Sequence, residues 1–230
     1  MDILGQMSSK MDPFSRIEAA ANFVDKKTAT SIRTKLKRVD EEVKSIERSS
    51  GLTYPPYYVE PVLRVVESGD NTGGLGVLYA RTIPVDVNGS ITIVVELSAP
   101  LVLYGTKRVL RIILAHELLH YLELVRRFVR MDISSQITSS SIMEEQYQDN
   151  SRVIDPSIVF KDKRLISQLR KEHLEGFTEE RLNEKCKSKW IERGLPVQKM
   201  PIGANQVSVS PESIIKTSFD HKAVDLVSGI

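Results

Sequence analysis

The stretch KRVLRIILAHELLHYLELVRRFVR, residues 107–130, decides the architecture of the chain, and its middle part, residues 109–125, is the most apolar segment of the sequence. At 3.6 residues per turn, its apolar residues fall on all sides of a helix. This pattern predicts a long and largely buried helix. Thr106 stands directly before the stretch as a helix-capping residue. Arg111, His116, Glu117 and Glu123 interrupt the apolar run, and the centre of a bilayer would penalise them heavily. We therefore expect a core helix of a globular domain and no membrane span.

His116, Glu117 and His120 make an HExxH motif inside this helix. At helical spacing the two imidazoles project from one face and can reach the same Zn²⁺ ion. Glu117 lies about 100° around the helix from His116, so it is placed to act on a zinc-bound water as general base. Burying such groups without partners would be costly, which argues against an incidental match. The single cysteine, Cys186, excludes a thiolate cluster, so the site must use imidazole and carboxylate.

The segment AHELLHYLE, residues 115–123, resembles the active-site helix of the zincin metallopeptidases. Glu123 and Arg126 stand where the metzincin branch has its glycine and final histidine, so the resemblance points to the gluzincin branch. It implies a zinc-dependent peptidase that hydrolyses peptide bonds in a peptide or protein substrate. In that branch the third zinc ligand is a glutamate from a later helix, often with another carboxylate four residues further on.

Two segments fit this description. The resemblance favours HLEGFTEERL, residues 173–182, because its glycine permits close approach to the HExxH helix. There Glu175 would bind zinc and Glu179 would orient a ligating imidazole from behind. The alternatives left open are Glu145 or Glu144, within a serine-rich stretch, and His173.

Short β-branched runs at residues 58–68, 76–83 and 90–97 predict strands, and Asn88-Gly89 predicts a hairpin between the last two. The fold class expected is α+β and zincin-like, with a small, mostly antiparallel sheet packed against the HExxH helix. The resemblance further implies that an extended substrate lies along an edge strand, for which residues 77–83 or 91–97 would serve.

Three regions are expected along the chain. Residues 1–50 form a helical N-terminal extension, with a short helix opened by Asp12-Pro13 and an amphipathic helix over residues 28–48. Residues 51–195 form the metallopeptidase domain. Residues 196–230 are rich in proline and read as an irregular tail with one strand over residues 206–210. This tail could occupy the substrate groove and make the enzyme latent.

The charges nearly cancel, at 32 basic against 30 acidic residues, so no overall field selects nucleic acid or an anionic membrane. The N-terminus lacks the apolar core of an export signal, and a soluble cytoplasmic protein is expected. A second interpretation is a catalytically silent zincin module that binds a protein partner. A third, association with nucleic acid, rests on the basic residues of 26–38 and on Arg126, Arg127 and Arg130.

Overall fold

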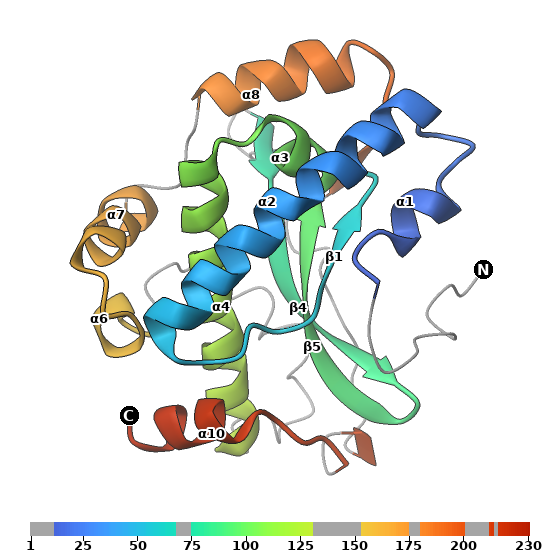
Figure 1. Ribbon diagram of the computed structural model, residues 1–230. Helices are drawn as coiled ribbons and strands as arrows, with labels where there is room; N and C mark the ends of the chain where they lie inside the picture. Colours follow the sequence, from blue (N-terminus) through green and yellow to red (C-terminus); the bar gives the residue numbers. More distant parts are fainter. Residues whose placement is uncertain (1–11, 68–74, 131–152, 175–179, 201–211, 214–215) are drawn as a thin grey trace.

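The computed structural model describes residues 12–67, 75–130, 153–174, 180–200, 212–213 and 216–230, and it mixes helices with two small sheets (Figure 1). The helices are α1 (Ser15–Ala19), α2 (Lys26–Ser50), α3 (Ala99–Tyr104), α4 (Lys107–Val129), α6 (Pro156–Val159), α7 (Lys163–Leu174), α8 (Glu180–Cys186), the π-helical turn η3 (Lys187–Ile191) and α10 (His221–Ser228). The strands are β1 (Tyr57–Glu60), β2 (Leu63–Glu67), β3 (Leu75–Leu78), β4 (Ala80–Val87), β5 (Ser90–Ser98) and β6 (Val197–Met200). The α+β class is therefore correct.

Helix α4 is the centre of the packing, as its apolar sequence predicts. The Thr106 side chain accepts a hydrogen bond from the Val109 N–H and caps the helix. Almost every residue from Val109 to Val125 is buried. Helix α2 crosses α4, and α10 lies against the C-terminal end of α4 (Figure 1).

The amphipathic helix expected over residues 28–48 is present as α2 and is slightly longer at both ends. It begins after Asp25, whose side chain accepts from the Thr28 N–H, and it ends at Gly51, which adopts the left-handed conformation with φ 75°. Ile32, Val39 and Ile46 on its apolar stripe are fully buried. Each such side chain contributes about 1.5–3 kcal/mol through burial. The N-terminal helix therefore belongs to the core of the molecule.

The strand pattern differs from the sequence prediction in two respects. The runs expected at residues 58–68 and 76–83 are each divided: β1 and β2 part near Pro61, and β3 and β4 part at Tyr79. The divided strands build separate sheets, ordered β1-β5-β4 and β3-β2-β6. Antiparallel pairing is the more extensive, as expected, but the strands form two sheets in place of one and each sheet also contains a parallel pair. The β2–β6 pair is parallel across a long connection that carries helices α3 to η3, whereas β1 and β5 are separated by strands β2, β3 and β4.

The hairpin predicted at Asn88-Gly89 joins β4 to β5. Both residues have positive φ, 55° and 76°, which matches the twist of a two-residue hairpin turn. Asp86 Oδ1 accepts a hydrogen bond of 2.8 Å from the Gly89 N–H and closes the turn. The antiparallel register then runs from Val87 opposite Ser90 to Ala80 opposite Leu97.

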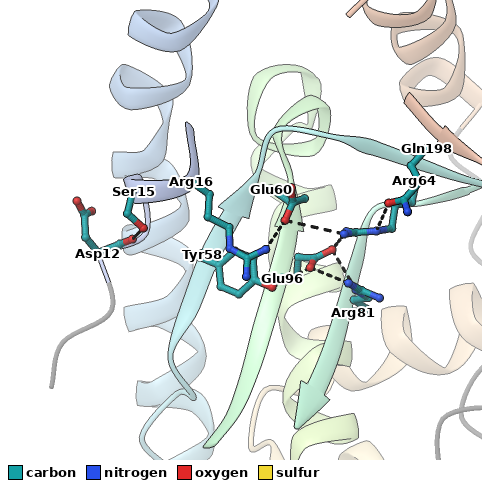
Figure 2. A network of polar contacts seen from close by, with 9 residues as sticks. All are labelled: Asp12, Ser15, Arg16, Tyr58, Glu60, Arg64, Arg81, Glu96 and Gln198. Carbon is teal, nitrogen blue, oxygen red and sulfur yellow. Dashed lines mark hydrogen bonds and ion pairs between the residues drawn. The ribbon is translucent and has the colours of Figure 1, made fainter. Parts of the chain in front are cut away.

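A buried ionic network joins the two sheets (Figure 2). Glu96 on β5 forms ion pairs with Arg81 on β4, at 2.9 Å, and with Arg64 on β2. The Tyr58 hydroxyl donates to the same carboxylate at 2.8 Å. Arg16 on α1 contacts Glu60 on β1 at 2.6 Å. Charged groups with such low exposure are retained only when they are paired, and here the pairing fixes β1, β2, β4 and β5 together.

The segment expected to be an irregular tail contains two regular elements. Strand β6 pairs in parallel with β2, and α10 begins at its cap Asp220 and buries Ala223 and Val227. These two residues are four apart, so they lie on one helical face. The Phe219 ring packs on Phe128 of α4 at 5.4 Å between centroids. The strand predicted over residues 206–210 lies outside the described residues.

Among the described residues, no helix is long and apolar enough to cross a lipid bilayer.

Candidate metal centre and catalytic carboxylate

Helix α4 brings the two motif histidines together. The Nε2 atoms of His116 and His120 lie 2.8 Å apart, and their rings meet edge to face with centroids 4.4 Å apart. This arrangement follows from the spacing of four residues, which stacks the two side chains one turn apart. Their placement is therefore compatible with the prediction that both imidazoles bind one metal ion.

The geometry of the two nitrogens suits a tetrahedral metal ion. Two ligands at about 2.05 Å from Zn²⁺ stand about 3.3 Å apart at the tetrahedral angle. The observed 2.8 Å between the Nε2 atoms requires a small rotation of the rings to reach that separation. Imidazole is also a common zinc ligand in catalytic sites. His116 and His120 thus fit the metal that the motif implies.

Glu117 follows His116 in the sequence and is buried, with 5% of its surface exposed. The Thr82 hydroxyl on β4 is 2.6 Å from Glu117 Oε2 and 3.1 Å from the Glu117 carbonyl oxygen. Burial raises the pKa of the Glu117 carboxyl to about 7, and the hydrogen bond from Thr82 acts in the opposite direction. A carboxyl with a pKa near neutrality can both accept and return a proton at physiological pH.

Thr82 is the residue of the site that sequence reasoning missed. It lies 35 residues before Glu117, and nothing local marks it, because threonine is common in strands. The hairpin register places Thr82 opposite Val95, which belongs to the main core on the α4 side of the sheet. Strand alternation is the one signal that could have found it.

A second side chain from outside the helix also reaches α4. The Tyr54 hydroxyl, from the connector before β1, donates a 2.9 Å hydrogen bond to the Leu114 carbonyl oxygen. Tyr54 is buried, and both burial and the nearby Glu117 carboxylate raise the pKa of its phenol. This hydrogen bond ties the helix to the connector half a turn before His116.

The outer strand beside the motif is β4. Among the described strands, β4 pairs only with β5, whereas β5 is paired on both sides. Residues 91–97 therefore cannot serve as an edge strand for substrate, because they lie in β5. The other candidate, residues 77–83, spans the end of β3 and the beginning of β4.

The proposed third ligands fall largely outside the described residues. This applies to Glu175 and Glu179 and to the alternatives Glu144 and Glu145. His173 lies in α7. Within the described ranges, no group of three His, Cys, Asp or Glu side chains is placed to hold a metal ion. The third ligand remains a prediction.

Comparisons of the chain with protein-family models, with curated proteins and with solved structures found no match. The function proposed below therefore depends on the motif and on the contacts of α4.

Proposed function

We propose that the protein is a zinc-dependent peptidase. The observation that carries this proposal is the convergence of the His116 and His120 Nε2 atoms, 2.8 Å apart, beside a buried glutamate held by Thr82. Bulky apolar residues occupy most of the remaining surface of α4, so these polar groups stand out against the rest of the helix.

Each residue has a distinct role in the proposed reaction. His116 and His120 would hold the ion, with Glu175 predicted as the third ligand and Glu179 behind it. When bound, zinc supplies a Lewis acid that polarises a carbonyl and lowers the pKa of a water toward ~7. Glu117 takes the proton of the attacking water and passes it to the leaving amine. Thr82 fixes Oε2 of that carboxylate and leaves the other oxygen for the proton.

A peptide is the favoured substrate class because its backbone can form hydrogen bonds with the edge of a strand. Among the described strands β4 is the outer strand of its sheet and contacts α4, and an extended peptide can add to such an edge through main-chain hydrogen bonds. Thr82 belongs to this strand, so a peptide bound there would lie close to Glu117.

Metal content and hydrolysis of denatured casein together test the proposal. We expect one zinc per chain by elemental mass spectrometry, with loss of metal in His116→Ala and in His120→Ala. Glu117→Gln should keep the zinc and lose hydrolysis by at least a hundredfold, the size of a general-base contribution. A wild-type chain without stoichiometric zinc, or a fully active Glu117→Gln variant, would show the proposal to be wrong.

The third ligand has its own matched pair of variants. Glu175→Gln should weaken zinc binding strongly, whereas Glu145→Gln should leave it unchanged. The reverse result would assign the ligand to Glu145 and leave the peptidase proposal intact.

The alternative is a silent or latent zincin module that acts by binding protein. Contacts between the C-terminal segment and the β4–β5 hairpin favour the latent form of this alternative. The Thr217 hydroxyl accepts a 2.9 Å hydrogen bond from the Ile91 N–H, and Ser213 donates to Asp86, so the C-terminal segment touches the β4–β5 hairpin. Deleting residues 196–230 would also remove β6 and α10 from the core. Thr217→Val and Ser213→Ala are the cleaner test: higher activity than wild type supports latency, and zinc binding without hydrolysis in any form supports a binding module.

A further inference from the structure

Two helical stretches of this nearly neutral chain are strongly basic. Residues 26–38 in α2 and residues 181–193 in α8 and η3 together contain eleven lysines and arginines. Their only acidic residues are Glu184 and Glu192. The rest of the chain is therefore acidic in balance, and the positive charge is concentrated in these two stretches.

The fold brings the two stretches together at the end of α3. Lys35 on α2 donates a hydrogen bond to the Leu103 carbonyl oxygen. The hydroxyl of the next residue, Tyr104, donates to the Lys189 carbonyl oxygen at 3.0 Å. Figure 1 shows α2 and the α8–η3 segment on either side of α3. Burial lowers the pKa of Lys35, and the charges of Arg38, Lys185 and Lys189 lower it further, as expected for cations that face one another.

A cavity of about 230 Å³ continues this surface toward the start of α4. Its lining contains three cations and no acidic residue: Tyr104, Thr106, Arg108, Val109, Arg181, Leu182 and Lys185. Lys185 belongs both to the cavity and to the group of cations around Lys35. We call Lys35, Arg38, Arg181, Lys185 and Lys189, together with this cavity, the basic surface.

Some basic residues elsewhere on the helices are paired with carboxylates of the protein. Arg126 and Arg127 both contact the buried Glu123, at 2.8 and 3.1 Å, so part of the charge of the cluster that they form with Arg130 in the sequence is balanced. Arg111 contacts Asp162 at 2.8 Å. Within the described ranges no ion pair involves Lys185, Lys189 or Arg38, which leaves their charge for a ligand.

We propose that the basic surface binds the phosphodiester backbone of a nucleic acid. The α-helical stretch of residues 26–38 covers twelve helical steps, or about 18 Å at 1.5 Å per residue. That length matches about five phosphates of one strand at 3.4 Å each. The five large apolar side chains exposed in the described residues all lie outside the two stretches. Protein partners are held by apolar anchors, whereas nucleic acid is held by polar, positive surfaces, so nucleic acid fits better than an acidic protein.

Fluorescence anisotropy of the full chain with a labelled 20-nucleotide oligothymidine tests the proposal. With about five phosphate contacts, the affinity should fall about a hundredfold between 50 and 200 mM salt. Lys185→Glu combined with Lys189→Glu should weaken binding at least tenfold and make the salt dependence shallower. Arg38→Glu with Arg181→Glu, which removes one cation of the basic surface from each helix, should have a similar effect.

The matched control is Lys44→Glu with Lys222→Glu, which changes the net charge equally at exposed positions outside the two stretches. This control should bind like wild type. The proposal would be overturned by an equal loss of binding in the control and in the basic-surface variants, by no binding at 50 mM salt, or by equal competition from polyglutamate. Circular dichroism confirms that the variants fold, and the assay needs neither zinc nor hydrolysis, so its outcome is independent of the peptidase proposal.

Discussion

Replacing Thr82 with valine should separate the hydrogen bond to Glu117 from the packing of β4. Valine has nearly the shape of threonine and lacks the hydroxyl that lies 2.6 Å from Glu117 Oε2. Thr82 is 4% exposed and Glu117 5%, so water cannot readily replace the lost donor. A hydrogen bond to a charged group contributes about 1.5–3 kcal/mol. The free energy of unfolding should therefore fall by about that amount.

Urea denaturation of the metal-free chain, followed by circular dichroism, measures this loss. The matched control is Thr92→Val on β5, where the threonine hydroxyl has no hydrogen-bond partner among the described residues and is partly exposed. Its effect should stay within about 0.5 kcal/mol. Thr82→Ser restores the donor and should recover most of the lost stability, apart from about 1 kcal/mol for the missing methyl group.

The same variants carry a catalytic readout that a packing defect would not produce. Because Glu117 acts on the reacting water, misplacing its carboxylate should lower kcat about tenfold or more and leave KM nearly unchanged. Serine should rescue kcat. If Thr82→Val matches Thr92→Val in both stability and kcat, the hydroxyl neither stabilises nor positions Glu117, and the reasoning is refuted.

Three further predictions concern other buried or capping groups. Glu96→Gln should destabilise the protein by about 3–5 kcal/mol in thermal or urea unfolding, because it leaves buried arginines under-compensated; a change below 1 kcal/mol would contradict this. Burial raises the pKa of Cys186 to about 11, so a thiol reagent at pH 8 should label it only after unfolding, and immediate labelling of the native chain would disprove its burial. Hydrogen bonds from Ser157 and then Arg170 lower the pKa of Asp155 to about 2. Its stabilising effect is therefore complete above its unfolded pKa of 3.8 and lost as the pH falls toward 2, so Asp155→Ala should cost about 1 kcal/mol at pH 7 and almost nothing at pH 2.

The parts of the fold that sequence predicts well are those fixed by neighbours along the chain. The convergence of His116 and His120 needs only the helical rise and a spacing of four. The Asn88-Gly89 turn needs only two residues that tolerate positive φ. Helix α2 follows from its apolar period and its two caps. In each case the decisive contacts lie within a few residues of one another.

The parts that the sequence does not reveal depend on contacts between distant segments. The division of the strand runs at Pro61 and Tyr79 sends adjacent segments into different sheets, and the parallel β2–β6 pair joins residues more than 130 positions apart. Helix α10 has only eight residues, so its apolar face is too short to be recognised in the sequence, and its packing on α4 depends on the folded chain. The hydrogen bond between Thr82 and Glu117 also joins two distant segments, so the sequence does not reveal it.

The two buried glutamates of α4 show how the difference between local and long-range contacts bears on function. Glu123 forms ion pairs with Arg126 and Arg127, one turn further along the same helix. These pairs lower the free-energy cost of burying its carboxylate, and Glu123 is therefore a structural group. Glu117 receives a neutral hydroxyl from another element, and its pKa is raised to about 7. The neutral donor favours the charged form of Glu117 only in part, so burial still leaves the pKa of this carboxyl raised. The choice of partner thus separates a carboxylate that stabilises α4 from one that is fit to move a proton.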